Sequence, residues 1–137
     1  MKTSLLIAAG LAVAAPAEAA NLSLNVEGLK PKGQLMVLLF DAERSWNAKN
    51  GAVREIRRRV STATAQIVVE GLAAGHYGAM VFQDLNLDGK MNFNLVGMPM
   101  EPYGFSNNSR GLFGPPAWGK AAFRFGGGSA VHSIRLK

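Results

Sequence analysis

Side-chain oxygens recur at every second position in one short segment of the chain, at Asp84, Asn86 and Asp88, and a glycine follows them. Loops that hold Ca²⁺ supply side-chain oxygens from their first, third and fifth positions. The seventh position supplies a backbone carbonyl, and the ninth contributes directly or through water. Applied to this chain, that spacing selects Asp84, Asn86, Asp88, Lys90 and Asn92. We therefore predict a loop that folds its oxygens around a hard cation.

The twelfth position of such a loop should be a bidentate Glu, and here it is Leu95. Asp41 and Glu101 are the acidic residues that could complete the ligand shell if the fold brings either one close. The alternative is a polar hairpin turn without metal, because Asp88-Gly89 alone is a strong hairpin signal. The low ligand charge predicts weak affinity, which suits a Ca²⁺-rich extracellular space.

A second segment combines aromatic rings with amides, and it contains Tyr103, Phe105, Asn107 and Asn108. An exposed set of this kind can stack on a sugar ring and hydrogen-bond its hydroxyl groups. We favour a supporting role, in which the two rings pin a long irregular loop onto the domain and the two amides form turns. Trp118 follows a Pro-rich stretch and is expected to belong to a rigid lid rather than to a binding face.

The sequence offers no convincing catalytic machinery. The chain lacks cysteine, which removes thiol nucleophiles and disulfides. His76 and His132 have no metal-ligand spacing, and there is no Gly-x-Ser-x-Gly motif. Carboxylates for glycoside hydrolysis could come only from Asp84, Asp88 or Glu101. We expect a non-catalytic protein, with a glycan hydrolase using Asp84 and Glu101 as the less favoured alternative.

Residues 1–19 are predicted to be a cleaved signal peptide. Lys2 precedes an uncharged apolar run at residues 5–15, and Ala17-Glu18-Ala19 supplies the small residues that a signal peptidase requires. The run is about half as long as the roughly 20 residues that a membrane-spanning helix needs. We expect an exported protein, periplasmic or secreted, without a transmembrane segment in residues 20–137.

The chain is basic, with a net charge of +6. In an exported protein this charge favours an anionic polymer of the cell surface over nucleic acid as a partner, but we favour the simpler interpretation that the charge only keeps the protein soluble. Separately, we expect the partner to be a protein or glycan of the cell envelope. The charge cluster consists of Arg54, Arg57, Arg58 and Arg59. We expect these arginines to protect an edge strand from edge-to-edge pairing. The alternative is a patch that binds lipopolysaccharide phosphate. The oligomeric state stays open.

Residues 20–137 are predicted to form one all-β domain. Alternating or continuous apolar segments predict strands at residues 21–27, 34–40, 52–60, 65–69, 76–83, 121–125 and 131–136. The run at 34–40 is apolar throughout, so this strand should be covered on both faces. Residues 41–51 should form a loop or a single helical turn, and residues 97–116 a long irregular loop. About seven strands joined by short turns predict a two-sheet antiparallel sandwich.

The chain resembles the bacterial family of exported proteins called domain of unknown function 2141 (DUF2141). The most specific shared segment is Glu101-Pro102-Tyr103-Gly104-Phe105-Ser106-Asn107, and the family usually has an Asp where this chain has Asn92. The other matching segments, in chain order, are Gly33-Gln34-Leu35, residues 37–40, 71–77, 82–90, 97–108 and 114–118.

The Leu-x-x-Gly-x-Tyr turn at residues 72–77 also resembles transthyretin-like and collagen-binding-protein B-type sandwiches, some of which carry a similar Ca²⁺ loop. This resemblance implies a single Ig-like (prealbumin-like) sandwich and no established activity. The chain ends without the Tyr-Arg-Gly-Ser motif of transthyretin-like hydrolases. Our main expectation is an exported, non-catalytic sandwich in which Ca²⁺ braces a long functional loop. A metal-free accessory domain is the alternative.

Overall fold

The computed structural model describes residue 10, residues 20–112 and residues 114–137. The predicted signal peptide therefore lies, apart from residue 10, outside the described residues. Within the described ranges, no helix is both long and apolar enough to cross a membrane. The elements are β1 (Asn21–Glu27), β2 (Gln34–Phe40), α1 (Glu43–Ala48), β3 (Arg54–Arg59), β4 (Thr64–Glu70), β5 (Gly75–Asp84), β6 (Tyr103–Phe105), η1 (Ser106–Asn108), α2 (Trp118–Ala121), β7 (Phe123–Phe125) and β8 (Ser129–Arg135).

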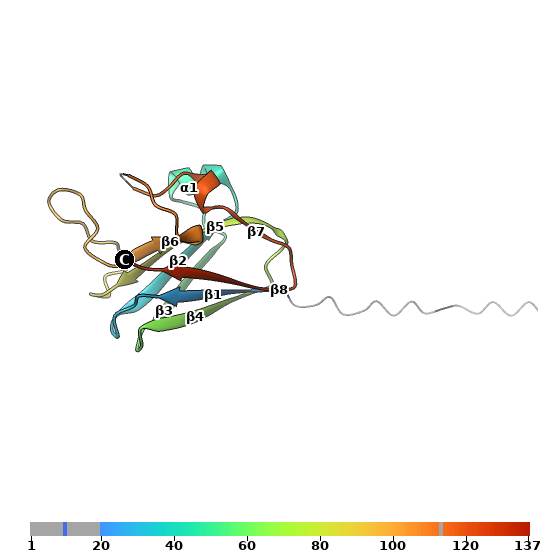
Figure 1. The fold of residues 1–137 in the computed structure, drawn as a ribbon, viewed down its shortest axis with the longest axis horizontal. Helices are drawn as coiled ribbons and strands as arrows, with labels where there is room; N and C mark the ends of the chain where they lie inside the picture. The colour runs from blue at the N-terminus through green and yellow to red at the C-terminus, as the bar shows by residue number, and fades with distance from the viewer. Residues whose placement is uncertain (1–9, 11–19, 113) are drawn as a thin grey trace, which may run out of the picture.

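Two sheets pack face to face, which confirms the all-β sandwich (Figure 1). One sheet has the strand order β4-β1-β8, and the other has the order β3-β2-β5-β6, with β7 also paired to β5. The alternating pattern of β1 explains the packing, because Leu22, Leu24 and Val26 are buried while their neighbours are partly exposed. These side chains meet Val37 and Val81 of the facing sheet in the main core.

The sandwich is not antiparallel throughout, contrary to the prediction. β1 pairs antiparallel with β4 but parallel with β8, so that Leu22 lies beside Ala130 and Val26 beside Ile134. Short turns force neighbouring strands to run antiparallel, but β1 and β8 stand at opposite ends of the chain and no hairpin constrains their direction. The Asn21 N–H donates to the carbonyl oxygen of Gly128 at 2.8 Å, which fixes where β8 begins.

Two short strands at the edge of β5 depart from the predicted elements. β6 lies inside the segment that was expected to be irregular, and the expected strand at 121–125 divides into the end of α2 and the three-residue β7. Three residues are too few to show a period of two. Both strands form because they pair with β5: Phe105 of β6 lies opposite Met80, and Phe123 of β7 lies opposite Tyr77.

The arginine-rich strand β3 is an edge strand, as predicted. It stands at the end of its sheet and pairs with β2 alone among the described strands. All four arginines are exposed, and Arg57 forms a 3.2 Å ion pair with Glu55 on the same strand. Charge on such an edge disfavours pairing with another chain.

A second apolar cluster covers the outer face of the five-stranded sheet. Its buried members are Phe40, Trp46, Phe105 and Ala121. The Trp46 ring lies 5.8 Å from that of Trp118, and its Nε1–H donates to the carbonyl oxygen of Pro116 at 2.9 Å. A Cβ atom on Gly78 would approach the Trp118 ring to 2.9 Å, so a glycine is needed beneath the two rings. This cluster explains why β2 is apolar on both faces.

Candidate metal site at the end of β5

The loop that follows β5 folds around the carboxylate of Asp84. This side chain is fully buried and accepts three hydrogen bonds. The backbone N–H groups of Asp88 and Gly89 donate at 3.2 and 2.7 Å, and the side-chain amide of Gln34 donates at 2.7 Å. Leu87 and Gly89 both have positive φ, at 61° and 76°, so the turn is sharp. Asp84 therefore acts as the centre on which the turn closes.

Asp88 lies on the exposed side of the same loop and gathers the polar groups around it. The Lys90 N–H donates to its Oδ1 at 2.9 Å, and the side-chain amides of Asn92 and Asn86 donate to its Oδ2 at 2.9 and 3.3 Å. These bonds, that of Asn92 first and that of Lys90 next, hold the pKa of Asp88 below its usual value. The loop residues selected by their spacing are thus brought together.

Glu101 supplies the carboxylate that the loop itself lacks. It is buried just before β6, and its Oε2 and Oε1 accept the N–H groups of Leu85 at 2.5 Å and Asn92 at 3.0 Å. Asp41, the other acidic candidate, follows the far end of β2. The near end of β2 is Gln34, which pairs with Asp84, and the two ends lie about 20 Å apart. Glu101 therefore joins the site and Asp41 does not.

The three acidic side chains form a compact, oxygen-only cluster. One carboxylate oxygen from each of Asp84, Asp88 and Glu101 lies within 4.8 Å of the other two. The ion pairs among the described residues join Arg57 to Glu55 and Arg135 to Glu27, so neither involves this cluster. Negative charges that are close together, partly buried and unpaired are unfavourable. A cation among them would remove that cost.

The aromatic rings of the second predicted segment pack into the second apolar cluster, and they are not members of the acidic cluster. Phe105 is buried against Trp46, with ring centroids 6.1 Å apart. Tyr103 is half-buried, lies 5.8 Å from Phe105 and has the Arg110 guanidinium over its ring. Trp118 is also half-buried. None of these three rings is fully exposed, which favours the supporting role over a sugar-binding platform.

The two amides of that segment are engaged with backbone. The Asn107 side-chain amide donates to the carbonyl oxygens of Lys120 and Ala122, both at 3.0 Å. The Asn108 Oδ1 accepts the Arg135 N–H at 2.9 Å. Both residues have positive φ, at 60° and 49°, which is the conformation that asparagine tolerates best after glycine. Their amides tie η1 to α2 and β8.

Sequence reasoning missed two glutamines that position the site. Gln34 donates to Asp84, as described above. Gln83 is fully buried; its Nε2 donates to the carbonyl oxygens of Lys30 and Lys32 at 2.5 and 2.7 Å, and its Oε1 accepts the Lys30 N–H at 2.9 Å. The available signal was a polar residue at the end of an otherwise apolar strand, Gln34 at the start of β2 and Gln83 near the end of β5. Together they hold the β1–β2 turn against the end of β5.

The fold and the site define a small β-sandwich with a candidate cation site in the loop after its longest strand. Residues 24–133 match the family described as "Uncharacterized protein conserved in bacteria (DUF2141)". The match spans most of the chain, which therefore belongs to this family, as its motifs predict. No curated protein and no solved structure matches the chain. The likeness to transthyretin-like sandwiches stays a prediction.

Proposed function

We propose that the loop from Asp84 to Glu101 binds a divalent cation, Ca²⁺, and that the ion braces this loop against the sandwich. The observation that carries the proposal is the cluster of Asp84, Asp88 and Glu101, whose oxygens lie within 4.8 Å of one another. Oxygen-only ligands suit a hard cation, whereas zinc prefers nitrogen and sulfur. A bound ion would tie the end of β5 to the start of β6.

The hydrogen bonds of the loop leave acceptor capacity for an ion. A carboxylate oxygen can accept two hydrogen bonds. Among the described contacts, Asp84 Oδ1, Asp88 Oδ1 and each oxygen of Glu101 accept one. The Asn92 Oδ1 is buried and has no hydrogen-bond partner among the described residues, so it is a candidate neutral ligand. Water and backbone oxygens would complete the six to eight ligands that Ca²⁺ takes.

The wider role that we propose is a non-catalytic module of the cell envelope, which binds an envelope protein or glycan or supports its structure. The N-terminal segment supports export. Asp84 and Glu101 are 0% and 6% exposed, which disfavours the hydrolase alternative, because catalytic carboxylates must contact the substrate. Intact-mass measurement on protein from the envelope fraction tests export. A mass that includes residues 1–19 would contradict signal cleavage.

A metal-free accessory domain is the second candidate, and one observation favours it. The N–H groups of Asp88 and Gly89 already stabilise the Asp84 carboxylate without an ion. The Asp88 Oδ1 also accepts the N–H of Lys90, two residues on, as in an ordinary Asx turn. The two candidates differ in one measurable respect. The metal-free turn predicts no response of the protein to Ca²⁺ or to a chelator.

Calorimetric titration of chelator-treated protein with Ca²⁺ tests the site directly. We expect saturable binding with a dissociation constant on the order of 10⁻⁴ to 10⁻³ M, as in weak extracellular sites. Asp88→Asn should weaken binding about tenfold or more while preserving the fold, because the Asp88 side chain is exposed. Asp41→Asn, a matched change at the far end of β2, should leave binding unchanged. Absence of binding by the wild type, or equal binding by both variants, would refute the proposal.

A further inference from the structure

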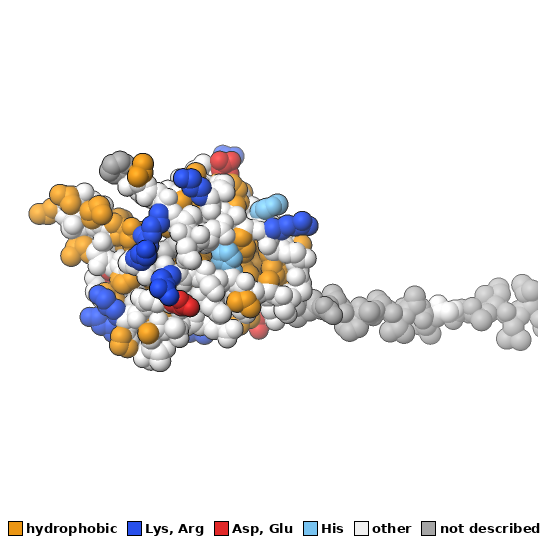
Figure 2. All heavy atoms as spheres, in the orientation of Figure 1, with side chains coloured by type: hydrophobic (Ala, Val, Ile, Leu, Met, Phe, Trp, Pro, Cys, Tyr) orange, Lys and Arg blue, Asp and Glu red, His pale blue; other side chains and the backbone are white. Residues whose placement is uncertain are grey.

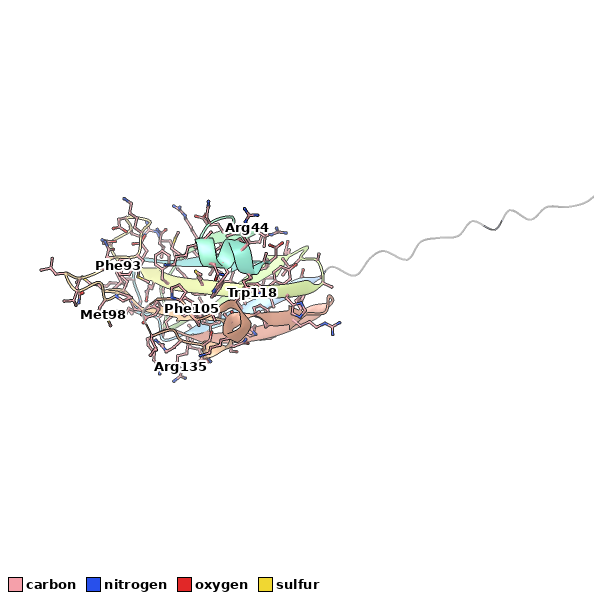
Figure 3. The ribbon with its side chains drawn as sticks, turned by 90° about the horizontal axis from the view of Figure 1, so that it is seen from above. Arg44, Phe93, Met98, Phe105, Trp118 and Arg135 are labelled. Carbon is pink, nitrogen blue, oxygen red and sulfur yellow. The ribbon has the colours of Figure 1, made fainter. Side chains whose placement is uncertain are left out.

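The loop between the two halves of the acidic site carries the densest group of large exposed apolar side chains among the described residues. Leu95 and Val96 are 107% and 80% exposed, and Phe93, Met98 and Met100 are each more than half exposed. No residue from 91 to 100 carries a charge. Figure 2 shows hydrophobic side chains gathered on a projection from the body, and Figure 3 places Phe93 and Met98 on that projection. Exposed apolar clusters of this kind mark interaction surfaces.

The backbone of this projection is partly hydrogen-bonded within the projection itself. Phe93 bridges Pro99, which has no N–H to satisfy. The Asn94 Oδ1 accepts the N–H groups of Val96 and Met98 at 3.0 and 2.9 Å. The Asn94 N–H donates in turn to the carbonyl oxygen of Met98 at 2.9 Å. Entry into an apolar medium is costly when backbone groups lose water without another partner. These internal bonds lower that cost for the tip.

Basic side chains surround the base of the projection. Gln83 precedes the loop, and its side chain holds the turn that carries the exposed residues Lys30 and Lys32. Tyr103 follows the loop and exchanges backbone hydrogen bonds with Lys137. We call these exposed basic residues the basic collar: Lys30, Lys32, Arg59, Lys90 and Lys137. Glu27, at the same end, is paired with Arg135, and the other acidic residues there form the carboxylate cluster.

We propose that residues 93–100 insert into the surface of an anionic lipid bilayer while the basic collar contacts the lipid headgroups. The neighbours Leu95 and Val96 are both almost fully exposed, so no side of the tip is covered by the protein. A bilayer surrounds an inserted tip on all sides, whereas a pocket on a protein surface contacts one face. The collar complements the negative headgroups of such a membrane. The proposal rests on exposure and charge and does not require the cation site.

Co-sedimentation with vesicles tests the proposal. The probes are vesicles of phosphatidylcholine alone and of phosphatidylcholine with phosphatidylglycerol in equal parts. We expect binding to the anionic vesicles, weakened by added salt because the collar contributes through charge. The double variant Leu95→Ser/Val96→Ser should bind about tenfold more weakly or worse, since burial of two large apolar side chains is lost.

A matched control makes the same two changes elsewhere. Leu112 and Val131 are also exposed, at 95% and 66%, and Leu112→Ser/Val131→Ser should retain the wild-type affinity. Failure of the wild type to bind anionic vesicles, or an equal loss in both double variants, would overturn the proposal. A dimer in solution that only the tip variant dissociates would overturn it too, because the tip would then contact a second copy of the chain.

Tryptophan fluorescence separates the tip from the apolar run at residues 5–15, which could itself bind lipid. In Leu95→Trp, anionic vesicles should shift the emission to shorter wavelength, and acyl chains carrying bromine should quench it. Leu112→Trp should show neither effect, while Trp46 and Trp118 contribute the same background to both variants. Equal responses of the two variants would show that the tip does not insert.

Discussion

Glu101 accepts the backbone N–H of Leu85 at 2.5 Å, although the two residues are sixteen positions apart. Its other carboxylate oxygen accepts the N–H of Asn92 at 3.0 Å. A single buried side chain therefore holds both ends of the acidic loop and places its charge beside Asp84 and Asp88. The same residue stabilises the loop and completes the candidate site.

Replacing Glu101 by Gln should lower the free energy of unfolding by about 1–3 kcal/mol in the presence of chelator. The new NH₂ group would face a backbone N–H, and a buried donor would lose its acceptor. Urea unfolding measures the change. Glu55→Gln is the control, because Glu55 lies in an exposed pair with Arg57 and should change stability by less than about 0.5 kcal/mol. Equal effects at the two positions would contradict the role of Glu101.

Calcium should raise the melting temperature of the wild type. A ligand that binds only the folded state adds about 2.7 kcal/mol of stability at 100 times its dissociation constant. Thermal melts with millimolar Ca²⁺ and with chelator measure the difference, which Asp88→Asn should largely abolish. Identical wild-type melts in the two conditions would favour the metal-free turn.

Phe105→Ala should destabilise the protein by about 3–5 kcal/mol, because the ring is buried against Trp46. Tyr103→Ala should cost less, since that ring is only half-buried. Phe93→Ala is the matched control, because the Phe93 ring is exposed and its loss should barely change the melting temperature. Unchanged melting of both variants, together with lost binding on a glycan array, would instead indicate a lectin-like site.

Acidification should weaken the attachment of η1 to β8. The Asn107 N–H donates to the Nε2 of His132 at 3.0 Å, and burial lowers the pKa of His132 below its usual value. The unfolded chain therefore binds a proton at His132 more readily than the folded protein does. The stabilisation is complete above the unfolded pKa of about 6.5 and is lost as the pH falls from there toward the folded-state pKa.

Urea unfolding at a series of pH values, from about 7.5 downward through the ordinary histidine pKa of about 6.5, measures this effect. His132→Gln should reduce the loss of stability across that range. His76→Gln, a change at an exposed histidine, should preserve it. A wild-type pH dependence that survives His132→Gln unchanged would assign the titration to another group.

Strands with a long apolar pattern could be predicted closely, whereas elements held by distant partners could not. Leu22, Leu24 and Val26 alternate over a full strand, so the sequence itself indicates β1. β6 has three residues and exists because Phe105 pairs with Met80. The Ser106 hydroxyl accepts the Ala79 N–H at 2.9 Å and donates to the carbonyl oxygen of Ala121 at 2.5 Å, a bridge that no local pattern contains.

The sequence alone determined the family, the all-β class and the spacing of Asp84, Asn86 and Asp88. Each of these depends on short segments, in which residues that are close along the chain are also close in space. Tertiary structure alone decided that Glu101 joins them in place of Asp41, that the first and last strands run parallel, and that the tip at residues 93–100 stands exposed. These features depend on which distant segments pack together. Burial of the two apolar faces settles that packing over the whole domain.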